Sequence, residues 1–580
     1  MIASFILSRT LVPTMAAYLL RAQVEAHKHG GAPSGFFGRF QKGFEHRFNL
    51  FRDGYRDLLT KAVERRGLFI LCFMGFPLIS IILVPALGRD FFPGIKSDEI
   101  DMHFRAPMGL RIEAASKIAA LVDVAIRQIL PGHVTNVIDN CGLPTSGINQ
   151  AYSASGTLGP QDCDLTISLN DPASPVDDYR TTLRKQLPKM FPGTTFTFLP
   201  GDITAKILNF GLPAPIDVQI SGRNLAANMT YAQGLIPELN KIPGIADVTI
   251  QQTLAQPTLM ISAHRAFALG AGLTEADIAN NTLSTLSGSG QTAPTYWLNR
   301  ETGVSYLVNL QTPQTQLTSM NDLEAIPIDK GDGDPSGTDA QLLGGLSDIA
   351  QLGRPLVVSH RDIIPVIDIY ANNQGRDLGA VSKAVDDALA RMKGSIPHSA
   401  TVHVRGQGVT MRDAYMQLLS GLLLSVVLVY LVIVVNFQSW LDPFIIITAL
   451  PGALTGVIWA LFLTDTTLSV PALTGAIMSV GTATANSILV VSFARDELAS
   501  HGDAVMAAVM AGFTRLRPVL MTALAMIIGM LPMSLSNSQN APLGRAVIGG
   551  LLVATFATLM FVPCVFALLH KSRPIEGEAA

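Results

Sequence analysis

The chain has 580 residues, of which 48% are hydrophobic and only 15% are charged, against about 25% charged residues in soluble proteins. Lys and Arg number 41 and Asp and Glu 44, so the net charge is −3, which argues against nucleic acid as a partner. This composition excludes a wholly disordered chain and argues against a soluble globular protein, and it predicts a membrane protein with large polar domains.

The chain lacks the sequence motifs of several enzyme classes. It has no G-x-x-x-x-G-K-[ST] loop, which argues against an ATP motor, and no H-E-x-x-H zinc motif. Its 4 cysteines match no zinc spacing. No nucleophile, base and orienting residue fall together in the polar part of the chain. We therefore expect no enzyme activity, no cofactor and no resident metal.

The N-terminal region predicts membrane-associated segments. Residues 1–20 are apolar with Arg9 near the middle, and they are either a signal anchor or the end of a transmembrane helix. Residues 21–66 carry more Lys and Arg than acids, which predicts a cytoplasmic location. Within them, the aromatic spacing of 37–58 predicts an amphipathic helix in the membrane interface. Residues 67–87 are long and apolar enough to span the bilayer.

The external block, residues 88–410, contains two copies of one pattern. Alternation of Ile100, Met102 and Phe104 indicates a half-buried strand. The first copy has strands at 98–106, 134–140, 163–170 and 193–199 and helices at 112–129 and 176–190. The second has strands at 215–221, 246–251, 364–371 and 401–405, helices at 224–241 and 379–393, and a mixed insertion at about 256–362. Each copy predicts a ferredoxin-like β-α-β-β-α-β unit.

Five more apolar segments follow the external block. They lie at 415–436, 443–463, 471–493, 518–536 and 546–569, and each is close to the roughly 20 residues that cross a bilayer. Alternating the loops between the two sides places most of the remaining basic residues inside, as the positive-inside rule expects.

Five stretches in the same order carry a family resemblance. They are GRDFFPGIKSDEIDMHFRAPMG (88–109), the passage 243–288, NFQSWLDPFIIITALPGALTG (436–456), VGTATANSILVVSFARDE (480–497) and RLRPVLMTALAMIIGMLPM (515–533). The chain resembles the C-terminal half of the inner-membrane subunit of a resistance-nodulation-division (RND) efflux pump, of the hydrophobe/amphiphile type.

The resemblance implies an α+β membrane protein in which a transmembrane helix bundle carries periplasmic ferredoxin-like pore subdomains and a docking subdomain. The implied parts are a first pore subdomain (88–205), a second pore subdomain (206–255 and 363–410), a docking-domain insertion (256–362), five helices (411–570) and a cytoplasmic tail (571–580). The family's N-terminal half is missing, so the resemblance presents this chain as a fragment or as half of a split pump.

The implied function is proton-motive-force-driven export of amphiphilic compounds from the bacterial inner membrane. The implied assembly is a homotrimer with the missing half, a periplasmic adaptor and an outer-membrane channel. One alternative is a truncated or split membrane scaffold or sensor that transports nothing. Heavy-metal efflux is a minor alternative, because most of the 20 methionines lie in apolar helices and 95–410 shows no Met/His cluster.

The resemblance also implies where protons pass. The family's acids lie on a helix that is absent here, and its usual Lys before an Asn on the tenth helix is Ala485 before Asn486. Asn486, in a polar stretch of that helix, is itself a relay candidate, with hydrogen bonding between packed helices as the alternative. Arg9 is a candidate replacement cation, unless it only snorkels to an interface. Arg515 and Thr522 match eleventh-helix positions in the family's proton path, although Arg515 also suits a positive-inside anchor.

The segment 141–162 corresponds to the family's switch loop beside the substrate cleft. Tyr152, Phe198 and Phe210 are the cleft candidates, with ordinary core packing as the alternative for each. Cys141 and Cys163 bracket this loop at the ends of two strands expected to be neighbours, so they could form a disulfide in an oxidising compartment.

Overall fold

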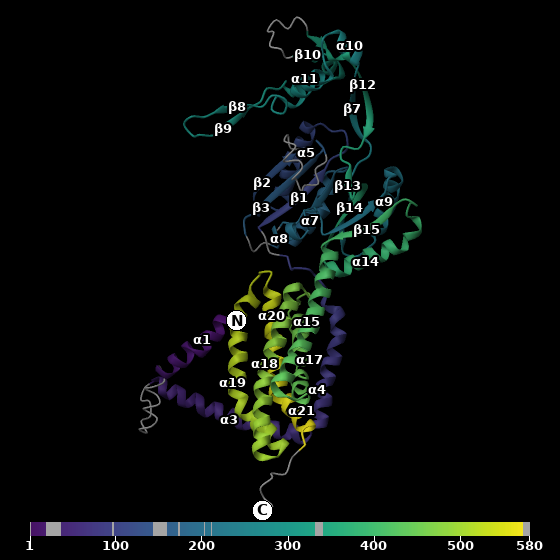
Figure 1. The fold of residues 1–580 in the computed structure, drawn as a ribbon. Coiled ribbons are helices and arrows are strands. Elements are labelled where there is room, and N and C mark those ends of the chain that lie inside the picture. The colour runs from purple at the N-terminus through teal and green to yellow at the C-terminus, as the bar shows by residue number, and fades with distance from the viewer. Residues whose placement is uncertain are drawn as a thin grey trace, which may run out of the picture. The chain divides into compact units, whose positions relative to one another are not determined.

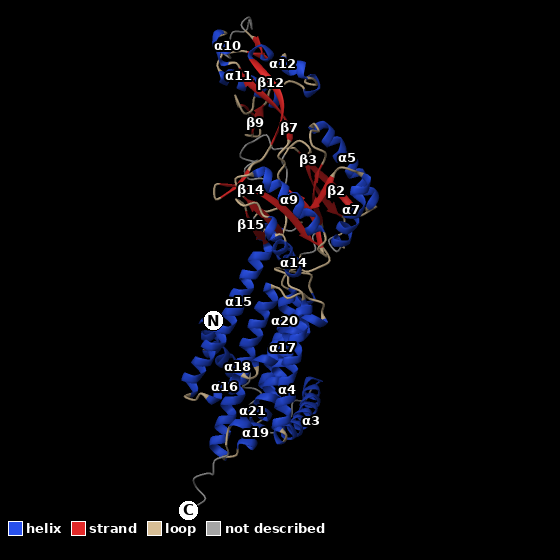
Figure 2. Ribbon diagram, turned by 90° about the vertical axis from the view of Figure 1, so that its right-hand side faces the viewer, coloured by secondary structure: helices blue, strands red, loops and turns tan. Residues whose placement is uncertain are grey.

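The computed structural model describes residues 2–18, 36–94, 98–142, 159–171, 175–201, 203–209, 211–330 and 340–571. The chain separates into two compact units. The first comprises Met1–Leu87, Gln417–Ser536 and Asn540–Ala580, and the second comprises Gly88–Met416 and Asn537–Gln539. The described strands all belong to the second unit, where Figure 2 draws them in red.

The first unit is a helix bundle. Its main elements are α4 (Arg66–Ser80) with a 3-10 extension (Ile81–Leu87), α15 (Gln407–Phe437), α16 (Leu441–Ile447), α17 (Leu450–Leu463), α18 (Val470–His501), α19 (Ala504–Leu535), α20 (Ala541–Phe556), a π-helical turn (Ala557–Phe561) and α21 (Val562–Leu569). In the described residues, these form 6 helical segments that are long and apolar enough to cross a membrane (Figure 1). Each overlaps one of the six predicted spans, but some extend well beyond it, since α19 begins at Ala504 and not at 518, and α15 begins at Gln407 and not at 415.

The most buried of these segments is the last, Ala541–Leu569, where 78% of the residues in its most apolar stretch are buried, against 6% in the corresponding stretch of α15. Helices α17 and α20 approach closely at a pair of glycines. A Cβ placed on Gly549 would lie 2.5 Å from the Gly456 carbonyl oxygen. Small residues let membrane helices come this near, so the contact explains why glycine occupies both positions.

Further helical stretches precede α4 in the described part of the first unit. Helix α3 (Phe36–Glu64) covers the predicted amphipathic segment, and it packs Leu59 and Val63 against the bundle. The Tyr55 hydroxyl donates to the Leu559 carbonyl at 2.6 Å. Helix α1 (Ile2–Arg9) is followed by a second helical stretch at 11–18, and the described side chains of 3–18 are all exposed. This stretch is not one of the 6 candidate spans.

The first α/β repeat of the second unit has the predicted element order. It consists of β1 (Glu99–Arg105), α5 (Ile112–Ile129), β2 (Val134–Cys141), β3 (Asp162–Leu169), α7 (Val176–Met190) and β4 (Thr195–Phe198). The sheet order is β2-β3-β1-β4 with antiparallel neighbours, as in a split βαβ unit. Ile100, Met102 and Phe104 are fully buried in one core with residues of α5 and α7. A short helix, α8 (Ile203–Leu208), follows the sheet.

The second α/β repeat has the same strand order. It consists of β5 (Ile216–Ser221), α9 (Leu225–Asn240), β6 (Ile245–Ile250), β14 (Ile364–Asn373), α14 (Leu378–Arg391) and β15 (Thr401–Gly406). Strand β14 pairs with both β5 and β6, β15 pairs with the other edge of β5, and β13 (Ser359–Arg361) adds to β14. Two sheets of one order confirm the internal repetition read from the sequence.

The insertion between β6 and β13 has a small core of its own, which includes Leu273, Ile278 and Leu343. Its elements are β7 (Gln256–Ala263), α10 (Arg265–Gly270), α11 (Glu275–Ser287), β8 (Thr295–Leu298), β9 (Ser305–Val308), α12 (Met320–Glu324), β10 (Pro327–Ile328), β11 (Gln341–Leu342), α13 (Leu343–Leu346) and β12 (Ser347–Arg354). Strands β7 and β12 pair along their whole length. The hairpin β8–β9 projects from the insertion (Figure 1).

Candidate functional site

Polar side chains line the face of the first sheet that points away from α5 and α7. Antiparallel register places Arg105 opposite Asp162 and His103 opposite Asp164. Arg105 Nε donates to Asp162 Oδ1 at 2.8 Å, and His103 Nδ1 lies 2.7 Å from Asp164 Oδ1. Asp101 and Thr166 are the next opposite residues on this face, and the Thr166 hydroxyl donates to the Asp101 carboxylate at 2.8 Å.

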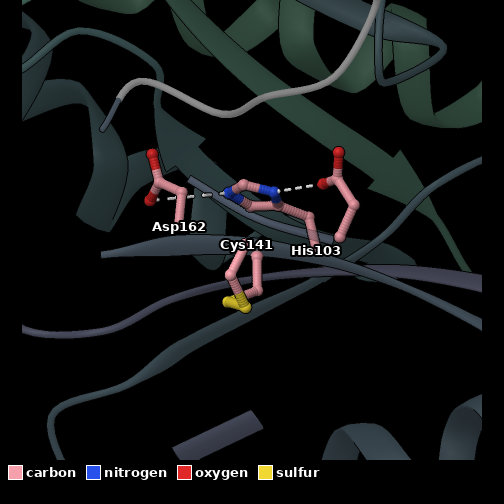
Figure 3. The surroundings of a disulfide bond; sticks show 5 residues. His103, Cys141 and Asp162 are labelled. Carbon is pink, nitrogen blue, oxygen red and sulfur yellow. Dashed lines mark hydrogen bonds and ion pairs between the residues drawn. A yellow bond between two sulfur atoms is a disulfide. The ribbon is translucent and has the colours of Figure 1, made fainter. Parts of the chain in front are cut away.

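Figure 3 shows the His103 ring between two carboxylates, with the disulfide on the opposite side of the strands. The bridge joins Cys141 to Cys163, which are directly opposite in the β2–β3 register. The disulfide that the sequence left open is therefore present, and it ties the two strands where the 141–162 segment begins and ends.

The polar face is buried, which the sequence did not indicate. The alternation in β1 predicts one buried and one solvated face, yet Asp101 and His103 are each only 6% exposed. Charged residues at alternate positions of β1 predict a solvated face, because a charge is buried only where it is paired. The pairs with Asp162 and Asp164 of β3 supply this compensation, and they depend on strand register, for which the sequence carried no signal.

A cavity of about 260 Å³ covers part of this face. The first repeat contributes His103, Arg105 and Phe198, so the predicted cleft candidate Phe198 does line a cavity. The facing wall is β6 with its following residue and two residues of β14, lined by Asp247, Val248, Thr249, Ile250, Gln251, Tyr370 and Asn372. The cavity therefore lies between the two α/β repeats, within the second unit.

Asp247 joins the two repeats at one end of the cavity. Its carboxylate accepts two hydrogen bonds from Arg184, at 2.7 and 2.6 Å, one from the Phe198 amide at 3.2 Å and one from Asn372 at 2.8 Å. Arg184 also lies over the Phe198 ring, 4.7 Å from its centroid, and donates to Gln374. The predicted cleft residue Phe198 thus takes part in the contact between the two repeats, through its backbone amide and through its ring.

A second carboxylate pair is buried in the second repeat. Asp217 on β5 and Asp368 on β14 are diagonal neighbours, since Tyr370 is opposite Asp217 and Gln219 is opposite Asp368. Gln219 donates to Asp217 Oδ2 and Gln252 donates to Asp368 Oδ2. Burial, together with repulsion from Asp368, raises the pKa of Asp217 to about 8, and burial raises the pKa of Asp368.

In the helix bundle, two of the four predicted proton-relay residues meet. The Thr522 hydroxyl on α19 donates to Asn486 Oδ1 on α18 at 3.1 Å. One residue further along α18, the Ser487 hydroxyl lies 3.1 Å from that of Thr558 in the π-helical turn. π-turns are frequent at functional sites. A role of these hydroxyl and amide groups in proton transfer stays a prediction.

The other two relay candidates are placed apart from this pair. The Arg515 guanidinium lies 4.9 Å from the Phe493 ring centroid. Arg9, at the end of α1, lies 5.8 Å from the Phe5 ring centroid, and in the described part of the chain no carboxylate forms an ion pair with it. That Arg9 supplies a positive charge to acidic residues on other helices stays a prediction.

One buried acid was overlooked in the sequence. The predicted span began at 443, but α16 starts earlier and includes Asp442 in its first turn, where it is 2% exposed. Its carboxylate lies 3.2 Å from His570 Nε2 and 3.6 Å from Arg495.

The cleft candidates Tyr152 and Phe210 lie outside the described residues. Among the described residues, no group of three or more His, Cys, Asp or Glu side chains is gathered as for a metal ion.

Comparisons with known proteins identify the family. The model of the AcrB/AcrD/AcrF family matches residues 1–570. A solved structure titled as a heavy metal efflux pump has the same fold, with a TM-score of 0.71 and 22% identity over 90% of this chain and 52% of that chain. The predicted RND fold is thereby supported by both sequence and structure.

Several curated relatives align over most or all of this chain. HelA of Legionella pneumophila is 25% identical over 99% of this chain and 53% of its own length. The cobalt-zinc-cadmium resistance protein CzcA of Cupriavidus metallidurans is 25% identical over 89% and 48%. The nickel and cobalt resistance protein CnrA of the same organism is 27% identical over 100% and 52%.

Two conclusions follow from these alignments. The chain spans about half the length of the curated relatives it matches. The predicted amphiphile type is not supported by them, because CzcA and CnrA are named for metal resistance. With a family model that covers nearly all of its length and a fold that agrees, this chain belongs to the AcrB/AcrD/AcrF family of RND permeases.

Proposed function

We propose that this chain is part of a proton-driven exporter of heavy-metal cations in the bacterial inner membrane. The observation that carries the proposal is the agreement among relatives that match 89% or more of the chain and are named for resistance to cobalt, zinc, cadmium or nickel. This substrate class takes the place of the amphiphiles expected from the sequence.

The cavity between the two α/β repeats is the proposed passage for the cation. Its lining includes the imidazole of His103, a common type of ligand for such metals, whereas the Asp247 carboxylate at the same cavity is already bound by Arg184. A transport site must release its cargo, so a single weak ligand suits it better than a closed metal cage.

The proposed pump needs more than this chain. Relatives are about twice as long, so the other half of the fold would come from the same or a separate polypeptide. We further propose a homotrimer, a periplasmic adaptor and an outer-membrane channel, with the second unit in the periplasm. The basic residues of 21–66 support this orientation, because they favour the cytoplasmic side.

Export of amphiphilic compounds is the second candidate. The supporting observation is the apolar part of the same cavity, formed by Phe198, Pro213, Ile236 and Ile250. Apolar walls with a few polar groups are typical of sites for organic ligands.

Deletion of the gene in its own host tests the two candidates together. If the proposal holds, the deletion strain becomes more sensitive to cobalt, nickel, zinc or cadmium salts, accumulates the metal, and keeps its resistance to cationic dyes and bile salts. Restoring the intact gene should reverse the change. Sensitivity to dyes and bile salts alone would favour the second candidate, and no change in either would contradict export.

A further inference from the structure

Helix α3 packs against the first half of α19, before the predicted span at 518–536 begins (Figure 1). A Cβ placed on Gly512 of α19 would lie 2.5 Å from Leu59 Cδ2 and 2.7 Å from the Tyr55 hydroxyl oxygen, both on α3. Tyr55 is also tied to the π-helical turn by its hydrogen bond to the Leu559 carbonyl. The two helices therefore meet at a defined place, which positions the side chains beside the contact.

Three arginines gather at this junction of α3 and α19, and each lies over an aromatic ring of the other helix. The guanidinium carbons of Arg52 and Arg56 on α3 lie 4.4 and 5.5 Å from the ring centroid of Phe513 on α19. In return, the guanidinium carbon of Arg517 on α19 lies 5.9 Å from the ring centroid of Phe48 on α3. Such cation–π contacts hold a guanidinium group in place without neutralising its charge.

The charges of these three arginines are not compensated by acids. In the part of the chain that the structure describes, none of the three forms an ion pair, and Arg52 Nε is buried without a hydrogen-bond partner. The acids next to them on α3, Asp53 and Asp57, are exposed and form no ion pair with described residues. A buried charged donor is costly unless it has an acceptor, so this junction is suited to an anionic ligand.

The surface next to the arginines is apolar. Met521 and Leu524 follow Arg517 by four and seven residues, so they lie on the same face of α19, and both are exposed. On α3 the exposed Phe51 directly precedes Arg52. A ligand with an anionic head and apolar chains fits this arrangement better than a free anion, because the chains would cover Met521 and Leu524.

We propose that the junction of α3 and α19 binds the phosphate headgroup of an anionic phospholipid, such as phosphatidylglycerol, in the cytoplasmic leaflet. Guanidinium groups donate paired hydrogen bonds to phosphate oxygens, and Arg52, Arg56 and Arg517 supply three of them around one site. The excess of basic residues in 21–66 supports the cytoplasmic side. Binding at this junction requires neither the metal cargo nor a proton, so it goes beyond the proposed export.

Lipid binding to the full chain, purified in a non-ionic detergent, tests the site. The chain is titrated with mixed micelles containing phosphatidylglycerol, with mixed micelles containing phosphatidylcholine, and with inorganic phosphate. Native mass spectrometry counts the bound lipid, and the melting temperature is followed in parallel. We expect phosphatidylglycerol to stay bound and to raise the melting temperature. At the same concentration, phosphatidylcholine lacks the net negative charge and inorganic phosphate lacks the acyl chains, so neither should have this effect.

Variants separate a specific site from a general attraction of basic residues to the membrane. Arg52→Gln should weaken phosphatidylglycerol binding roughly ten-fold, as for the loss of one charge-assisted hydrogen bond. Arg52→Lys keeps the charge but loses the planar fork, so it should also weaken binding. Arg47 is exposed on the same helix and has no ring contact with described residues, so Arg47→Gln should bind as the wild type does. If Arg52→Gln fails to fold, Arg56→Gln at an exposed arginine gives a second test.

Equal binding of the two lipids, or the same effect from inorganic phosphate alone, would overturn the proposal. Equal weakening by Arg47→Gln and Arg52→Gln would also overturn it, because a diffuse attraction would then account for the binding. The binding assay requires no transport. A gene deletion without metal sensitivity would therefore reject the proposed cargo and leave the lipid result intact.

Discussion

Arg184 of α7 holds Asp247 of β6 through both carboxylate oxygens, and this contact joins the two α/β repeats. The Asp247 side chain is 2% exposed, and its backbone φ of 53° lies in the left-handed region that few residues other than glycine adopt. Asp is one of the residues that tolerate this region. The side-chain contacts and the unusual backbone conformation therefore require the same residue type.

Removal of this carboxylate should destabilise the second unit. Asp247→Ala leaves the half-buried Arg184 without its carboxylate partner, and because Arg184 keeps some solvent contact the cost should lie below the roughly 3–5 kcal/mol of breaking a fully buried ion pair. Chemical denaturation of the purified full chain measures the loss. Asp247→Asn keeps the tolerance for positive φ and the contact with Arg184 through one oxygen, so it should lose less. Equal losses in the two variants would show that charge is irrelevant at this contact.

The pair Asp217 and Asp368 should make stability fall as the pH rises. In the folded chain the pKa of Asp217 is about 8, against an ordinary value of 3.8, so the folded state binds the proton more tightly than the unfolded state. The resulting stabilisation is complete below about pH 4 and is lost progressively as the pH rises through about 8. Melting temperature measured across this range should therefore decline toward alkaline pH.

Asp217→Asn should remove most of that decline, because the amide stays neutral at every pH. The matched control is Asp362→Asn, whose side chain is 91% exposed and should leave the profile unchanged. A wild-type melting temperature that is flat between pH 5 and pH 8.5 would contradict the raised pKa.

The close approach of Gly456 and Gly549 makes a prediction about helix packing. In Gly549→Ala the new Cβ would lie 2.1 Å from the Ala460 Cβ, so α17 and α20 must separate. Overpacking of this kind typically costs about 1–3 kcal/mol, which should appear as a lower melting temperature of the detergent-solubilised chain. Gly529→Ala on α19 is the control, because nothing lies within 4 Å of its Cβ position. Equal effects of the two substitutions would refute the close-contact argument.

The hydrogen bond between Thr522 and Asn486 tests the predicted proton path. Thr522→Val removes the donor and keeps the shape, so stability should fall by only about 0.6 kcal/mol, as for other hydrogen bonds between membrane helices. If the pair carries protons, metal efflux by the complete pump should fall several-fold more than this small loss explains. Thr474→Val, at an exposed threonine of α18, is the control for loss of a hydroxyl. Unimpaired efflux in Thr522→Val would remove the residue from the path.

Local sequence pattern determined the elements and their order. The six apolar segments, the two β-α-β-β-α-β repeats and the insertion could be predicted, because hydropathy and the strand and helix periods depend only on neighbours in the chain. The strands of a split βαβ unit follow one sheet order, so even the neighbouring positions of Cys141 and Cys163 were within reach. The order of the five matching stretches was likewise enough to predict the family. It did not predict the heavy-metal substrates for which the relatives are named.

The cavity was decided by the tertiary structure. Arg184 and Asp247 are 63 residues apart, and Arg105 lies 145 residues from the Ile250 carbonyl to which it donates. Which polar residues become buried depends on how one repeat covers the sheet of the other, and strand alternation carries no information about that. The sequence by itself thus determined the helices, strands and repeats, whereas only the packing of distant segments brought His103, Arg105 and Asp247 to one cavity.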